Sequence, residues 1–178
     1  MKKLHLCSGE SKLHGWLSVD ARADTKPDIV SDIALLPFEL EAQSVDEIYL
    51  CHGLEHIPFA DAEHVLSGLC KLLKPQGVMR LAVPDFEVLT DMYQEGVPLA
   101  LIRGALMGGQ DYPLNTHYSV WDYKLLKVTM EHAGLQDVKR YDAFTFISQN
   151  GGPNFFDWSI GKIEGRFISL NLIGVKNA

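Results

Sequence analysis

The first half of the chain alternates short runs of β-favouring residues with a helical pattern, and this alternation limits the folds that it can adopt. Strands are expected at residues 3–7, 17–20, 28–30, 45–51 and 78–83. A helix is expected from about residue 61 to 73, with Asp61 as its N-cap and its apolar side chains on one face. Residues 74–77 are expected to form a turn. This order predicts a doubly wound, three-layer α/β fold, in which a mostly parallel sheet carries helices on both faces.

The second half of the chain is less regular. Helices are expected over 85–94 and 122–133, an apolar segment over 97–107, and loops over 110–119 and 150–154. Residues 138–141 and 144–147 are interpreted as parts of a sixth strand, and 167–175 as a strong final strand that forms a hairpin with it. The segment 85–119 is the only candidate for a lid or an acceptor-binding segment.

Length and charge limit the class of protein. The 178 residues predict one domain, spanning 1–178, and the net charge of −7 without a basic run argues against a nucleic-acid partner. The sequence has no long apolar segment, so neither a signal peptide nor a membrane span is predicted. The three cysteines lie far apart in apolar runs, which is typical of the free thiols of a cytoplasmic protein.

The stretch 4–20 has features of a nucleotide-like cofactor site. A first strand leads into the small and polar residues Cys7–Ser11, and a second strand ends in an acid, Asp20. Such a loop offers backbone N–H groups, and such an acid accepts hydrogen bonds from a ribose. Only Gly9 and Gly15 remain of a G-x-G-x-x-G pattern, so a plain tight turn is equally consistent, and an NAD site is disfavoured.

Longer segments carry a family resemblance. They are LHLCSGESKLHGWLSVDA, SDIALLPF, SVDEIYLCHGLEHI, LCKLLKPQGVMRLAVPDF and GGQDYPLNTHYSVWDYKLLKVTMEHAGL. The chain resembles class I S-adenosylmethionine (SAM)-dependent methyltransferases, and more narrowly the short predicted SAM-dependent methyltransferases called methyltransferase-like proteins. The resemblance covers almost the whole chain. It implies a Rossmann-like sheet of about seven strands with an antiparallel C-terminal strand beside the sixth, and SAM as cofactor.

The resemblance also implies roles for residues at the ends of the first three strands. Cys7, Ser8 and Gly9 match the loop beside the methionine part of SAM. Asp20 matches the acid that binds the ribose hydroxyls, and Asp32 matches the acid near the adenine amino group.

The resemblance implies three further cofactor contacts. Ile33 would supply a backbone N–H and an apolar contact, and His52 and Gly53 would line the cofactor beside the methyl donor. The first loop departs from the usual E/D-x-G-x-G-x-G. The alternative to a methyltransferase is therefore a protein that binds SAM or S-adenosylhomocysteine without transferring a methyl group.

Methyl transfer to a hydroxyl needs a base, and His is the usual one near neutral pH. The candidates are His52, His56 and His117, with His117 favoured. Each has another interpretation: His52 as a wall of the cofactor pocket, His56 as a side chain that fixes a loop through a backbone group, and His117 as a surface residue. Glu55 is interpreted as structural. No metal is expected, because H-x-x-x-H lacks the Glu of H-E-x-x-H and a third ligand is not evident.

The absence of an N-P-P-Y-type segment after the fourth strand disfavours planar amide or adenine nitrogens as acceptors. The resemblance, and no particular residue, implies a hydroxyl-bearing small molecule or a glycan as the acceptor. An open site would suit such a large acceptor, and a second subunit in a homodimer would be another way to complete it.

Overall fold

The computed structural model describes residues 1–35, 40–151 and 155–177. Its main feature is a seven-stranded sheet in the order β3-β2-β1-β4-β5-β9-β6. The strands are β1 (Lys3–Leu6), β2 (Leu17–Asp20), β3 (Ile29–Val30), β4 (Val45–Cys51), β5 (Leu73–Pro84), β6 (Leu135–Arg140) and β9 (Ser169–Lys176). The first five are parallel, whereas β9 runs antiparallel between β5 and β6. The expected sheet, including its antiparallel C-terminal strand beside the sixth, is confirmed.

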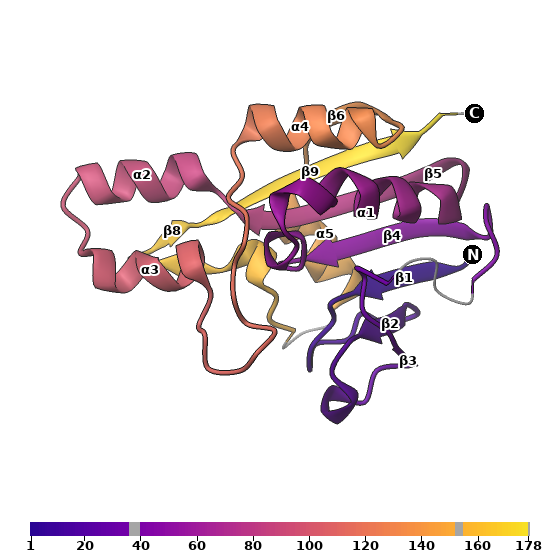
Figure 1. The fold of residues 1–178 in the computed structure, drawn as a ribbon, viewed down its shortest axis with the longest axis horizontal. Coiled ribbons are helices and arrows are strands. Elements are labelled where there is room, and N and C mark those ends of the chain that lie inside the picture. The colour runs from indigo at the N-terminus through magenta and orange to yellow at the C-terminus, as the bar shows by residue number, and fades with distance from the viewer. Residues whose placement is uncertain (36–39, 152–154, 178) are drawn as a thin grey trace.

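Helices cover both faces of the sheet, as Figure 1 shows. On one face, α1 (Phe59–Leu72) and α4 (Tyr123–His132) pack over β4, β5 and β9. On the other face lies α5 (Ala143–Asn150). Successive side chains of β4 alternate between these layers: Ile48 and Leu50 join the first core, while Tyr49 joins the second. This period of two is what a strand buried on both faces requires.

A third, smaller core lies beyond the carboxyl end of β5. There α2 (Phe86–Gln94) and α3 (Leu99–Met107) pack on each other through Leu89, Met92 and Ile102, with Ile168 beside them. Asp85 caps α2, because its carboxylate accepts the N–H of Glu87. This helical pair and the loop after it make up the segment 85–119.

Short elements complete the chain. They are the 3₁₀ turns η1 (Ala23–Thr25), η2 (Leu54–His56) and η3 (Trp158–Ile160), and the small hairpin of β7 (Lys162–Ile163) and β8 (Arg166–Phe167). Disulfides are absent from the described cysteines, so the expectation of free thiols is confirmed. Among the described helices none is both long and apolar enough to cross a membrane.

Two expected boundaries are wrong. Helix α1 begins at Phe59 after Pro58, so Asp61 lies in its first turn, near the positive end of the helix dipole, and is not its cap. The expected turn at 74–77 lies inside β5, where the pairing with β4 shifts register and Gln76 has a φ of 63°. Residues 74–77 thus lie opposite the single residue Asp46 of β4, and this irregularity in the strand uses the same Pro and Gly signals as a turn.

One expected strand is a helix. Residues 144–147 belong to α5, which Asp142 caps by accepting the N–H of Thr145. Its buried residues Ala143, Phe146 and Ile147 have helical spacing, and Phe146 and Ile147 pack on the sheet. The sixth strand itself, β6, begins three residues earlier than expected, at Leu135 and not at residue 138. Of the expected loop at 150–154, residues 152–154 lie outside the described part of the chain.

Candidate functional site

A cavity of about 820 Å³ lies at the carboxyl ends of β1, β2, β3 and β4. Parallel sheets bind ligands at this edge, because loops from neighbouring strands diverge there. Every residue that the sequence proposes for the site lines the cavity: Cys7, Ser8, Gly9, Asp20, Asp32, Ile33, His52, Gly53, His56 and His117. The fold thus brings together residues from five separate segments; their roles there stay predictions.

The loop after β1 is held by the acid at the end of β2. Asp20 is 9% exposed, and its Oδ2 accepts the N–H of Gly9 at 2.7 Å while its Oδ1 accepts the N–H of Arg22 at 2.8 Å. Gly9 and Cys7 both have φ near +50°, which bends the chain sharply away from β1. No helix separates β1 from β2 in these described residues, and the hydrogen bond from Gly9 to the Asp20 carboxylate fixes the loop between them.

The loops after β1 and β4 approach each other closely. A Cβ on Gly53 would lie 2.6 Å from Cys7 Sγ and 2.5 Å from Leu50 Cδ1, so only glycine fits there. Burial raises the pKa of the Cys7 thiol far above its usual value, which keeps it protonated. Cys7 is therefore an apolar wall of the cavity and not a nucleophile.

Asp32 and Ile33 follow β3, and both line the cavity. Asp32 Oδ1 accepts the N–H of Ala34 at 2.9 Å, which fixes the turn after the strand. Ile33 is buried in the main core, so its backbone is anchored while Asp32 stays partly exposed to the cavity.

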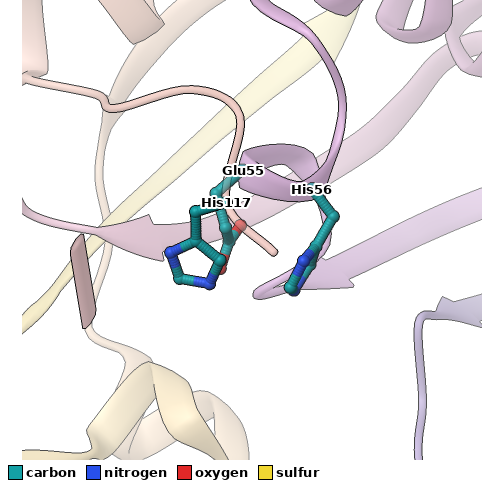
Figure 2. A group of neighbouring side chains, drawn as sticks. All are labelled: Glu55, His56 and His117. Atoms are coloured by element: carbon teal, nitrogen blue, oxygen red, sulfur yellow. The ribbon is translucent and has the colours of Figure 1, made fainter. Parts of the chain in front are cut away.

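A buried acid surrounded by imidazoles forms another wall of the cavity. Glu55 is 1% exposed, and neither of its carboxylate oxygens has a hydrogen-bond donor within the described part of the chain. His52 Nδ1 lies 3.1 Å from Glu55 Oε1, an ion-pair contact when the ring is protonated, but it is not aligned for a hydrogen bond. Figure 2 shows Glu55 and His56, from η2, beside His117, from the loop after α3.

Backbone carbonyls fix the tautomers of two of these rings. His56 Nδ1 lies 3.0 Å from the carbonyl oxygen of Thr116, and His117 Nδ1 lies 3.1 Å from that of Ala105. Because a carbonyl only accepts, each Nδ1 carries the proton and each Nε2 keeps its lone pair. The contact of His56 with Thr116 ties the loop after α3 to η2, the tethering role considered for His56.

His52 is held differently. Ser169 Oγ donates to the carbonyl of Trp158, so His52 Nε2, 2.7 Å from that Oγ, donates to it. Its Nδ1 faces Glu55. With Nε2 bonded to Ser169, Nδ1 held against Glu55 and a backbone φ of 48°, His52 is the most constrained of the three histidines.

Burial and charge oppose each other in this group. Burial alone would raise the pKa of Glu55, but His52, His56 and His117 outweigh it and hold the pKa of this carboxyl below its usual value. Burial lowers the pKa of His117, although Glu55 acts in the opposite direction. Near neutral pH Glu55 is therefore ionised and the His117 ring is neutral.

Some residues of the cavity wall come together only through the fold. The sequence places Glu55 beside His56, whereas its closeness to His117 depends on tertiary structure. Arg22 is not among the residues that the sequence proposes: its guanidinium carbon lies 4.9 Å from the Tyr112 ring centroid, and both residues line the cavity. They join the loop after β2 to the loop after α3.

No family model and no curated protein matches the sequence. Solved structures do match in fold. A SAM-dependent methyltransferase from Archaeoglobus fulgidus has a TM-score of 0.60 at 16% identity, covering 98% of this chain and 86% of its own. One from Thermotoga maritima has a TM-score of 0.59 at 16% identity, covering 99% and 82%.

A third match comes from Haloferax volcanii, in a complex between the methyltransferase activator Trm112 and its methyltransferase partner. It has a TM-score of 0.58 at 17% identity and covers 99% of this chain and 82% of that one. Together with the strand order, these likenesses show that the chain has the class I SAM-dependent methyltransferase fold.

Proposed function

We propose that the chain binds SAM and transfers its methyl group to a hydroxyl-bearing acceptor. The observation that carries the proposal is that all the residues matched to SAM contacts line one cavity at the carboxyl edge of the sheet. Asp20 would bind the ribose hydroxyls, Asp32 the adenine amino group, and the N–H of Ile33 the adenine ring. Cys7, Ser8 and Gly9 would flank the methionine part.

The proposed methyl donor faces the Glu55 wall. Bound SAM supplies an electrophilic methyl group on a sulfonium, and His52 and Gly53 would border it. The acceptor oxygen then forms the O–CH₃ bond as the S–CH₃ bond breaks, so alignment carries much of the rate. His117 is the proposed proton acceptor, because its Nε2 keeps a lone pair, whereas Nε2 of His52 donates to Ser169 and Nδ1 faces Glu55.

The proposed acceptor class is a carbohydrate or another hydroxyl-rich molecule. Exposed aromatic rings of Tyr118, Phe156 and Trp158 line the cavity and offer flat apolar surfaces for a sugar ring. We also propose that the opening suits a bulky acceptor, or a second copy of the chain that covers it. Sedimentation of the purified protein tests the second arrangement.

A second function is favoured by one observation. The first loop is short and departs from the usual glycine-rich pattern, and Asp20 accepts the N–H of Gly9 in this loop and that of Arg22 after β2, so a ribose would have to share the carboxylate. A protein that binds SAM or S-adenosylhomocysteine without transfer would fit this loop.

Two measurements separate these functions. Calorimetry should show binding of SAM and not of NAD, and Asp32→Ala should reduce discrimination between the adenine and hypoxanthine forms of the cofactor. Transfer of radiolabel from methyl-labelled SAM to a panel of hydroxyl compounds then tests catalysis. If SAM does not bind, the proposal fails; if it binds without transfer to any acceptor, the second function is favoured.

A further inference from the structure

We propose that Glu55, His56 and His117 bind one divalent transition-metal ion, for which Zn²⁺ is the probe. One ligand atom from each of the three residues lies within 4.8 Å of the others, at the wall of the cavity. Two imidazoles and one carboxylate form the protein ligand set of many catalytic zinc sites. The spacing of these residues in the sequence does not indicate a metal site, because His117 comes close to the other two only in the folded chain (Figure 2).

The carboxylate of Glu55, a residue that is 1% exposed, is buried and accepts no hydrogen bond within the described part of the chain. A buried carboxylate without hydrogen bonds is costly, so such groups are paired or coordinate metals. His52 lies against Oε1 alone, which leaves Oε2 for a cation.

The orientation of the two histidines is the second argument. His56 donates from Nδ1 to the carbonyl of Thr116, and His117 donates from Nδ1 to the carbonyl of Ala105. Metal-binding histidines are typically held by such a bond on the nitrogen that does not bind the metal. Both rings therefore present Nε2 lone pairs without needing to change tautomer.

The geometry requires only modest adjustment. At zinc–nitrogen distances of about 2.0–2.1 Å, tetrahedral ligands are roughly 3.3 Å apart. The largest separation, 4.8 Å, exceeds that spacing by about 1.5 Å, so the side chains would draw together around the ion. Three protein ligands leave a fourth position open, and all three residues line the cavity, so that position faces its interior.

An open position gives the ion a role, and this step rests on the proposed function. An acceptor hydroxyl bound there would have its pKa lowered and would release its proton to water. The resulting alkoxide would form the O–CH₃ bond while the S–CH₃ bond breaks and its electron pair stays on sulfur. His117 would then hold the ion instead of accepting the proton.

The test uses the untagged protein, stripped with a chelator and free of SAM. Titration against a competing chelator should show one Zn²⁺ per chain. Glu55→Gln and His117→Gln should each weaken binding by about 100-fold or more. Co²⁺ should give ligand-field absorption bands that both variants lose. His132→Gln is the matched control, because His132 also lies beside an acid, with its Nδ1 3.3 Å from Glu63 Oε2, but on the surface.

The outcomes decide the proposal. Stoichiometric binding that both folded variants lose and His132→Gln keeps would support it. No stoichiometric binding, or equal binding in the variants, would overturn it. If Glu55→Gln does not fold, His117→Gln alone decides, because His117 lies on a loop. Calorimetry of SAM on stripped protein is separate, so a failure of SAM binding leaves the zinc result standing.

Discussion

The carboxylate of Asp20 accepts the backbone N–H of Gly9 at 2.7 Å, which joins the end of the second strand to the loop after the first. The other oxygen accepts the N–H of Arg22. Each carboxylate oxygen can accept two hydrogen bonds, so a ribose diol can share this side chain with the loop. Asp20 thus shapes the cavity as well as lining it.

Asp20→Ala should weaken SAM binding by about 1.5–3 kcal/mol, the range for hydrogen bonds to a charged group. Calorimetry measures the effect. Asp28→Ala is the matched control, because Asp28 also accepts a backbone N–H, from Ser18 at 2.8 Å, but lies outside the cavity. Unchanged SAM affinity in a folded Asp20→Ala protein would remove Asp20 from the site.

Gly53→Ala should lower the free energy of unfolding by about 1–3 kcal/mol, because its Cβ would collide with Cys7 and Leu50. Urea unfolding measures the loss, and Cys7→Gly in the same chain should restore part of it. Gly104→Ala, in the middle of α3, is the control: its Cβ would meet nothing within 4 Å, so stability should hold or rise. Equal effects of the two glycine substitutions would contradict the close approach.

Acidification should destabilise the protein through His5. Burial lowers the pKa of His5 from 6.5 to about 4, although Asp157 and Asp20 act to raise it. Between these values the unfolded chain binds a proton that the folded chain does not. The contribution of neutral His5 to the free energy of unfolding should therefore be complete above pH 6.5. It should fall as the pH drops toward 4, by on the order of 3 kcal/mol.

The comparison of pH 7 with pH 5 isolates this contribution. His5→Phe keeps a ring against Tyr49, 5.2 Å away between centroids, and should flatten the dependence of the urea midpoint on pH. His64→Phe, at an exposed position of α1, should not. A pH dependence that persists fully in His5→Phe would assign the effect to other groups.

His117→Ala should lower kcat by about 10²–10⁴-fold and leave SAM affinity nearly unchanged, whether His117 accepts the proton or holds an ion. His56→Ala should also reduce thermal stability, because it loses the tether to Thr116. Both are measured once labelled SAM has identified an acceptor. Activity close to wild type in His117→Ala would exclude both roles.

The sequence predicted most of the sheet because its strands are locally encoded. The bounds of β2 and β4 agree with the expected ones, since β-favouring runs end there at polar residues. Helix α5 escaped prediction because Phe144–Ile147 is β-favouring by composition. Its helical state comes from the cap at Asp142 and from packing on the sheet.

The site was predictable where it follows strand ends and unpredictable where it depends on long-range packing. Asp20 and Asp32 stand directly after short strands, so a parallel sheet places them on one edge. The grouping of Glu55 with His117 depends on α2 and α3 folding over the carboxyl end of β5, which no local pattern encodes.

The position of β9 has a consequence for how the chain is made. This strand fills the gap between β5 and β6, yet the ribosome makes it after both. Until it emerges, each of those strands presents an unpaired edge to the surroundings. Such edges are templates for pairing with other chains, so the interval during synthesis is when the nascent polypeptide is most open to aggregation and to chaperones.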